Sequence, residues 1–292
     1  MNIENVVIVG GGLMGSGIAQ VCAQSGIKAT LIDTRAEALQ KALKSIAWSV
    51  NKMIEKGRIP GSVEEIMDRI DISGDYGAAQ GADLCIEAVY EDRKTKEAVF
   101  RKLDRAAGSQ AVLATNTSAI SISALASATS RPHRFLGLHF FSPVPMMGAA
   151  EVIKGAETDN ETFSFGLDFV RALGKEPIPV RRDVPGFVIN RINYRANLEA
   201  MRLVEEGVAS VEEIDQGLRL ASGRKMGPFE IGDLVGLDVT HGALMSIYEE
   251  TKDLYWYPPP NLRRKVKAGH LGRKTGRGWY DYNPDGTRKE RK

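Results

Sequence analysis

A glycine-rich turn near the N-terminus restricts the possible folds of this chain more than any other feature. Gly10, Gly12 and Gly15 directly follow the apolar run Val6–Val9 and have the spacing G-x-G-x-x-G, and a helix-length apolar stretch comes next. Glycines placed in this way let the backbone approach a pyrophosphate, toward which the first N–H groups of the helix point. The turn predicts a dinucleotide-binding unit that holds its ligand through Gly10, Gly12, Leu13, Met14 and Gly15.

The next apolar run, Ala29–Ile32, ends at Asp33. This carboxylate lies about twenty residues beyond the glycines, where it can accept hydrogen bonds from both hydroxyls of an adenosine ribose. It would repel the additional phosphate of NADP, so NAD is the expected cofactor. Arg35 leaves NADP open, because a guanidinium at this position could pair with a 2′-phosphate. A structural alternative is that the glycines only form a tight turn and Asp33 caps the following helix.

The fold class follows from the alternation of short apolar runs with helix-length segments over about the first 180 residues, a pattern typical of βα units and a parallel sheet. The long amphipathic segment 35–56 is one expected helix, and a capping-box sequence at Ser62 and Glu65 begins another. The expected strands are Val6–Val9, Ala29–Ile32, Leu84–Ala88, Val112–Thr115, Phe135–Phe140, Glu151–Lys154 and Ile178–Val180. We expect an α/β chain whose residues 1–184 form a Rossmann-type domain.

The periodicity changes after residues 183–186, DVPG, where apolar residues begin to recur at helical spacing from Ile189 onward. A second capping box at Ser210 and Glu213 starts a further helix, and Gly223 ends it. Residues 185–292 are therefore expected to form a smaller all-α domain. Because its segment 234–248 is rich in apolar residues, we also expect this domain to pair with a second copy in a homodimer.

Composition excludes several classes of protein. A net charge of +2 over 292 residues argues against nucleic-acid binding, and the longest apolar runs are far too short to span a membrane. No signal-peptide pattern opens the chain, so a soluble cytoplasmic protein is expected. Cys22 and Cys85 lie in apolar surroundings without a CxxC motif or a neighbouring histidine, which indicates buried thiols and no metal site.

The segment FLGLHFFSPVPMMGAAEVIKG contains the candidate catalytic pair. A strand ends near His139, a proline-rich turn follows, and a second strand begins near Glu151, so the turn could fold the carboxylate back toward the imidazole. A carboxylate that fixes the tautomer of a histidine makes it a competent general base. A single histidine at a strand end can equally be structural.

Seven ordered motifs together resemble the 3-hydroxyacyl-CoA dehydrogenase family, including its short-chain 3-hydroxybutyryl-CoA enzymes, and they span nearly the whole chain. The motifs are GGGLMGSGIA at 10–19, EAVYED at 87–92, TNTSAISI at 115–122, GLHFFSPVP at 137–145, VPGFVINR at 184–191, MGPFEIGDLVGLD at 226–238 and GRKTGRGWYDY at 272–282. The resemblance implies an NAD-dependent oxidoreductase of fatty acid metabolism that acts on the C3 hydroxyl of a (3S)-3-hydroxyacyl-CoA.

The resemblance also implies a role for individual residues. His139 would be the general base and Glu151 its orienting partner, while Ser118 would hydrogen-bond the reacting oxygen and contact both cofactor and CoA. Asn190 would position the substrate, although it could instead only cap a helix. Further cofactor contacts are implied for Glu91, Lys96, Ser142 and Lys274, and CoA contacts for Ser49 and Lys56. Each of these charged residues could instead be a solvated surface group.

Two departures from the family pattern bear on specificity. Ser142 stands where many relatives have Asn, and Gly148, Ala149 and Ala150 replace a Lys-Leu-Val stretch. The smaller residues could widen the acyl pocket, so a bulkier acyl-CoA is one alternative substrate. A free hydroxy acid or sugar acid is another, as in the L-gulonate 3-dehydrogenase branch that resembles lambda-crystallin, although HFFSPVP looks more like the acyl-CoA branch.

Overall fold

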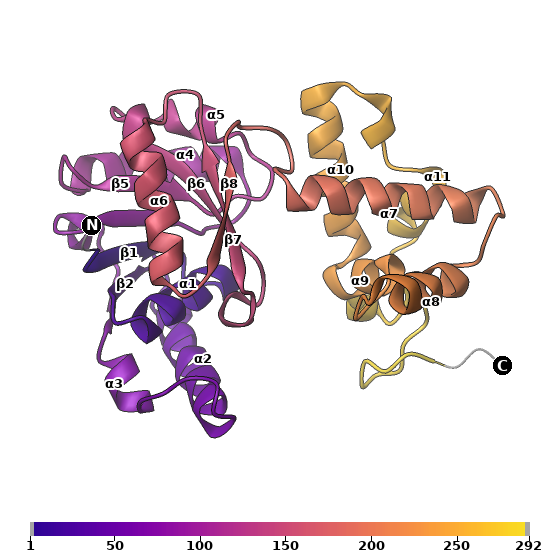
Figure 1. The fold of residues 1–292 in the computed structure, drawn as a ribbon, viewed down its shortest axis with the longest axis horizontal. Helices are drawn as coiled ribbons and strands as arrows, with labels where there is room; N and C mark the ends of the chain where they lie inside the picture. Colours follow the sequence, from indigo (N-terminus) through magenta and orange to yellow (C-terminus); the bar gives the residue numbers. More distant parts are fainter. Residues whose placement is uncertain (1–2, 290–292) are drawn as a thin grey trace. The chain divides into compact units, whose positions relative to one another are not determined.

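The computed structural model describes residues 3–289, which divide into two compact units (Figure 1). The first ends at Phe187 and the second begins at Val188. The boundary predicted from the sequence is 184/185.

The first unit contains a single sheet of eight strands within the described residues, in the order β3-β2-β1-β4-β5-β6-β7-β8. The strands are β1 Asn5–Val9, β2 Lys28–Ile32, β3 Ile70–Ser73, β4 Leu84–Glu87, β5 Val112–Thr115, β6 Phe135–Phe140, β7 Ala149–Lys154 and β8 Glu176–Val180. All neighbouring pairs are parallel except β6 and β7, which are antiparallel. The expected Rossmann-type sheet is confirmed. Its strand β7 runs antiparallel to β6, because a turn of only eight residues, 141–148, joins the two strands.

Helices cover both faces of this sheet, and Figure 1 shows α6 in front of it and α4 behind it. The helices are α1 Leu13–Gln24, α2 Ala36–Glu55, α3 Val63–Met67, α4 Arg93–Ala106, α5 Ile122–Ala126 and α6 Asn160–Ala172. On α2, the residues Leu39, Ala42, Ile46 and Val50 are buried at helical spacing, and with side chains of α1 and α6 they form one hydrophobic core. The predicted capping box at Ser62 and Glu65 is confirmed.

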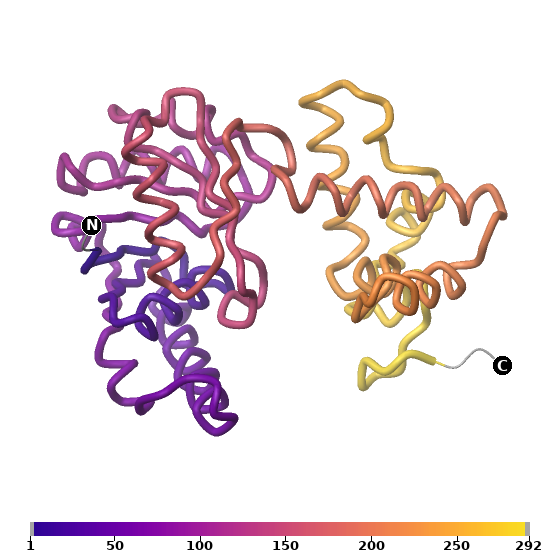
Figure 2. The backbone as a smooth tube through the Cα atoms, viewed as in Figure 1, coloured from indigo at the N-terminus to yellow at the C-terminus, as the bar shows by residue number. Residues whose placement is uncertain are grey.

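The second unit is helical, as expected, with α7 Ile189–Glu205, α8 Val211–Ser222, α9 Pro228–Val235, α10 Leu237–Thr251 and α11 Pro260–Lys267. The capping box at Ser210 and the left-handed Gly223 delimit α8 as predicted. Figure 2 traces the chain beyond α11 back past α9, where Asp233 accepts hydrogen bonds from the backbone of Trp279 and Tyr280. Motifs 226–238 and 272–282 therefore hold this unit together around a buried carboxylate.

No helix in residues 3–289 is long and apolar enough to cross a bilayer. Cys22 and Cys85 are both buried, and burial raises the pKa of each thiol to about 12, which keeps the thiols protonated. The prediction that they are buried thiols is confirmed.

Candidate active site

The polar side chains of interest lie at the carboxyl ends of neighbouring parallel strands. β1 leads into the glycine-rich turn, β2 ends before Asp33, β4 ends at Glu87, and β6 carries His139. In an open α/β sheet this edge is the usual ligand site.

Packing explains two of the three motif glycines. A Cβ on Gly10 would lie 2.6 Å from the Ala88 carbonyl oxygen, and one on Gly15 would lie 1.9 Å from that of Gly10. A Cβ on Gly12 would meet no described protein atom within 4 Å, so the space over Gly12 is open. No side chain among the described residues caps the first turn of α1, whose N-cap is Gly12. This turn therefore fits a bound pyrophosphate, the anionic part of NAD.

Asp33 is held in place by the backbone on both sides. Its Oδ2 accepts a hydrogen bond from Gly11 N at 2.8 Å, and its Oδ1 accepts one from Arg35 N at 2.9 Å. The Arg35 guanidinium, largely exposed, lies 3.6 Å from the same Oδ1. Because a carboxylate offers about four lone-pair sites, Asp33 retains acceptor capacity for ribose hydroxyls.

A cavity of about 710 Å³ extends from the glycine-rich turn along α2. Its walls are the start of α1, one face of α2 and the turn that follows β6, with Ser49 among the residues of α2. The lining residues of that turn are Pro143, Val144 and Pro145. The cavity therefore connects the dinucleotide turn to the chain segment directly after His139.

His139 and Glu151 form a buried pair. They are register partners in the antiparallel ladder of β6 and β7, and His139 Nδ1 lies 2.6 Å from Glu151 Oε2. A carboxylate accepts, so Nδ1 carries the proton and donates it in this hydrogen bond, which leaves the lone pair on Nε2. The rings of Phe141 and Phe187 pack against the imidazole at centroid distances of 4.9 and 5.6 Å.

A buried lysine holds the turn between the two strands. Lys175 Nζ donates hydrogen bonds to the carbonyl oxygens of Val144 at 2.8 Å and Met147 at 2.6 Å. Burial lowers the pKa of Lys175. The turn that carries Ser142 and walls the cavity is thus fixed from β8, just before which Lys175 lies.

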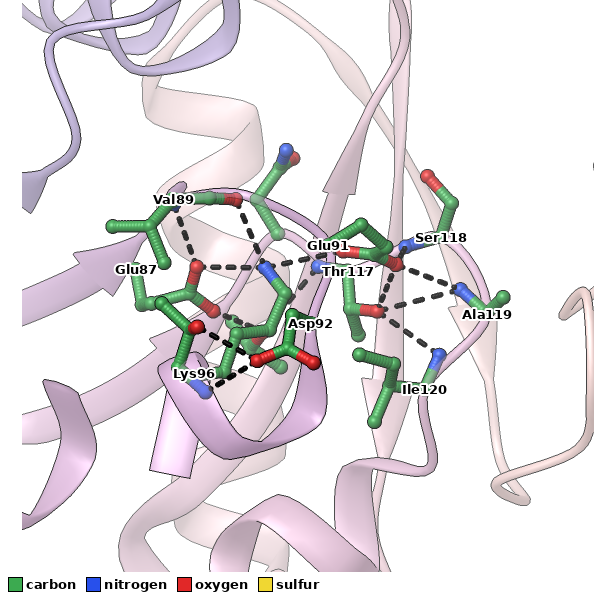
Figure 3. A network of polar contacts seen from close by, with 12 residues as sticks. Glu87, Val89, Glu91, Asp92, Lys96, Thr117, Ser118, Ala119 and Ile120 are labelled. Atoms are coloured by element: carbon green, nitrogen blue, oxygen red, sulfur yellow. Dashed lines mark hydrogen bonds and ion pairs between the residues drawn. The ribbon is translucent and has the colours of Figure 1, made fainter. Parts of the chain in front are cut away.

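A second buried network joins β4 to the loop after β5 (Figure 3). Lys96 Nζ lies 2.7 Å from Glu87 Oε1 and 3.1 Å from Glu91 Oε2. Glu91 Oε1 accepts hydrogen bonds from Ser118 N at 2.8 Å and from the hydroxyl of Thr117. Burial raises the pKa of Glu87, and the Lys96 ammonium opposes that rise. Glu91 therefore clamps the loop that presents Ser118, and Lys96 holds Glu91.

Both units of the chain match models of one protein family. Residues 5–184 match the model of the 3-hydroxyacyl-CoA dehydrogenase NAD binding domain, and residues 186–282 match that of the C-terminal domain of the same family. The chain belongs to the 3-hydroxyacyl-CoA dehydrogenase family.

Curated and solved members of the family match over nearly the whole chain. The mitochondrial hydroxyacyl-coenzyme A dehydrogenase of Mus musculus is 41% identical, covering 96% of this chain and 91% of its own. The 3-hydroxybutyryl-CoA dehydrogenase of Clostridioides difficile is 39% identical, covering 95% and 99%. The crystal structure of (S)-3-hydroxybutyryl-CoA dehydrogenase from Ralstonia eutropha superposes with a TM-score of 0.93 at 39% identity, covering 97% of this chain and 100% of the other.

In this member of the dehydrogenase family, the predicted site residues fall into separate groups. The structure brings together His139 with Glu151, and Glu91 with Lys96 and Ser118. Lys96 is 1% exposed, and its ammonium pairs with the carboxylates of Glu87 and Glu91. Its expected contact with the cofactor stays a prediction. Ser49 lines the cavity, Lys56 follows the last residue of α2, and Ser142 is exposed in the turn after β6.

Two predicted residues belong to the second unit of the dehydrogenase. Asn190 lies in the first turn of α7. Lys274 Nζ pairs with both carboxylate oxygens of Asp238, at 2.6 and 2.7 Å. No group of three or more possible metal ligands occurs among residues 3–289.

Three residues at this site are missing from the sequence-based prediction. Glu87 ends an otherwise apolar strand, LCIE, and a charged residue in such a strand is a readable signal of a buried polar network. Lys175 and Phe187 carry no such local signal, because their roles depend on contacts with β6 and the turn after it.

Proposed function

We propose that this protein transfers a hydride between the C3 hydroxyl of a (3S)-3-hydroxyacyl-CoA and NAD, with His139 as general base. The observation that carries the proposal is the buried His139–Glu151 hydrogen bond at the carboxyl edge of a sheet whose glycine-rich turn fits a pyrophosphate. The names of the relatives support a CoA thioester as substrate.

The proposed reaction requires a proton acceptor whose tautomer is fixed. Nε2 of His139 takes the proton of the 3-hydroxyl while Nδ1–H stays bonded to Glu151, and the carboxylate stabilises the imidazolium that forms. NAD, when bound, supplies the acceptor for the C3 hydride. The hydroxyl of Ser118, on the loop clamped by Glu91, donates a hydrogen bond to the reacting oxygen. Asn190 orients the thioester.

The remaining binding roles are part of the same proposal. Gly10, Gly12, Leu13, Met14 and Gly15 hold the pyrophosphate and Asp33 the adenosine ribose, with further cofactor contacts from Glu91, Lys96, Ser118, Ser142 and Lys274. Ser49 and Lys56 on and after α2, together with Ser118, bind CoA. We also infer a homodimer, as expected from the apolar segment 234–248 of the helical domain, and a cytoplasmic location.

The bulkier acyl chain, the alternative suggested by residues 148–150, gains little support from their positions. Ala150 is fully buried in the core beside Phe140, and Gly148 faces open space. Neither residue lines the cavity along α2. A small residue at 150 therefore fills a place in the core and does not enlarge that cavity.

The deciding experiment follows the near-ultraviolet absorbance of NADH after mixing with protein and acetoacetyl-CoA. We expect rapid oxidation of NADH with the thioester, slow oxidation of NADPH, and no reaction with free acetoacetate. Turnover of free acids without turnover of the thioester would move the assignment to the hydroxy-acid or sugar-acid alternative.

Replacing Asp33 by asparagine is expected to reduce discrimination between the two cofactors. The amide keeps an acceptor for Gly11 N but loses the charge that repels a 2′-phosphate, and a charge-assisted hydrogen bond contributes about 1.5–3 kcal/mol. The ratio of kcat/KM for NADH to that for NADPH should fall by about tenfold or more. Arg35→Ala is the opposing variant: it keeps the carboxylate and removes the cation that could pair with a 2′-phosphate, so the ratio should not fall. An unchanged ratio in Asp33→Asn would mean that Asp33 only supports the turn.

A further inference from the structure

An exposed tryptophan on α2 has no role in the chemistry described so far. Trp48 is 66% exposed, whereas Trp256 and Trp279 in the second unit are 1% and 4% exposed. Trp48 lines the cavity that runs along α2. Most cavity residues of this helix share one face at helical spacing, and together they are Glu37, Ala38, Lys41, Ala42, Ser45, Ile46, Trp48 and Ser49. An indole exposed on a cavity wall offers a flat surface to a ligand.

The position of Trp48 along α2 separates it from the dinucleotide site. Trp48 follows Ala38 by ten residues, which is about 15 Å along the axis of a helix. An adenosine whose ribose is held by Asp33 lies at the start of α2 and does not extend that far. A ligand that covers Trp48 therefore lies beyond the dinucleotide in the same cavity, which is also lined by Pro143–Pro145 of the turn after β6.

The charges on α2 identify the chemistry of this ligand. The helix and its C-cap carry Lys41, Lys44, Lys52 and Lys56, and Lys52 pairs with Glu55 at 2.6 Å. Within residues 3–289 no carboxylate lies within 4.0 Å of the ammonium groups of Lys41, Lys44 or Lys56. Glu37 is the one carboxylate among the cavity residues. A flat ring bearing phosphate groups complements an exposed indole among such cations.

We propose that Trp48 stacks on the adenine ring of the CoA thioester and sets the preference of the enzyme for CoA over acyl carriers that lack the nucleotide. The inference rests on the proposed function, since it assigns a specificity-determining contact to the same substrate. Ser49, the next residue, lies on the same cavity wall. Loss of one base–aromatic stack weakens binding by about tenfold.

Fluorescence tests the contact without catalysis. CoA alone, titrated into wild-type protein, should quench tryptophan emission, because Trp48 is the exposed indole and the other two are buried. Pantetheine, which lacks the adenosine and its phosphates, should leave the emission unchanged. Quenching by both compounds, or by neither, would overturn the proposal. This result does not depend on turnover, so a failure of the proposed function in the activity assay is a distinct outcome.

Kinetics of variants provide the second test. In Trp48→Ala, the ratio of kcat/KM for acetoacetyl-CoA to that for acetoacetyl-pantetheine should fall about tenfold. Trp48→Tyr keeps an aromatic face and should restore most of the ratio. An equal loss with both thioesters would indicate a structural residue. A raised KM for NADH with an unchanged ratio would assign Trp48 to the dinucleotide, and an unchanged ratio and KM would leave the indole as a contact for another protein. Each of these outcomes overturns the proposal.

Discussion

Replacement of His139 by alanine is expected to lower kcat for acetoacetyl-CoA reduction by about 10²- to 10⁴-fold, the usual contribution of a positioned general acid or base. In this direction the protonated imidazole donates its proton to the reacting oxygen, and alanine has none to give. NADH affinity should remain close to that of the wild type, because the imidazole bonds Glu151 and lies between aromatic rings. Steady-state kinetics and a titration of NADH measure the two quantities separately.

Two matched variants make this result interpretable. His133→Ala removes an exposed histidine and should leave kcat unchanged. Glu151→Gln retains a hydrogen-bond partner for Nδ1 but loses the charge that stabilises the imidazolium, so we expect a smaller loss of kcat than in His139→Ala. If His139→Ala weakened NADH binding as much as it slowed turnover, the histidine would be structural and the proposed mechanism wrong.

Replacement of Lys96 by methionine is expected to lower the free energy of unfolding by about 3–5 kcal/mol at neutral pH, because it leaves the fully buried carboxylate of Glu87 without its cation. Lys94→Met, at an exposed position of the same helix, should change it by less than about 0.5 kcal/mol. Urea denaturation compares the variants. A loss near that of Lys94→Met would mean that the ion pair adds nothing to stability.

The stability of the Lys96 variant should also depend on pH in a defined direction. Burial raises the folded-state pKa of Glu87 above the ordinary value of 4.5, and removal of Lys96 removes the charge that opposes this rise. The folded protein then binds the proton more tightly than the unfolded chain does, so stability falls as the pH rises from the ordinary pKa of a glutamate through the raised pKa of Glu87. The deficit relative to wild type should therefore shrink as the pH is lowered toward 4.5. A deficit that grew on acidification would exclude Glu87 as its cause.

The parts of the fold that can be predicted from the sequence are those whose residues form a local apolar or polar pattern. Central strands such as Leu84–Glu87 and Val112–Thr115 are buried on both faces and appear as apolar runs. The strand β3, Ile70–Ser73, was not predicted, because it lies at the sheet edge and alternates apolar and polar residues over only four positions. The antiparallel direction of β7 follows from the short turn that joins it to β6, so it could be inferred from the length of that turn.

In the candidate site, too, some contacts could be predicted from the sequence and others could not. Contact between His139 and Glu151 was predictable, since both lie on either side of one short proline-rich turn. The burial of Lys96 between Glu87 and Glu91 was not, because the three residues come from β4, α4 and the loop between them, and only the folded geometry excludes water from the ammonium. The roles of Asn190 and Lys274 were predicted from motifs alone. The contacts proposed for them are with the substrate and the cofactor.

The pairing of β6 with β7 decides which face of the sheet His139 and Glu151 share. Side chains alternate between the two faces of a strand. His139 and Glu151 therefore lie on the same face only while their register in the β6–β7 ladder is preserved. A single-residue deletion inside either strand would send the imidazole and the carboxylate to opposite faces, whereas length changes within 141–148 leave this register intact. Natural variation in length should therefore be concentrated in the turn, where it can reshape the cavity wall without separating His139 from Glu151.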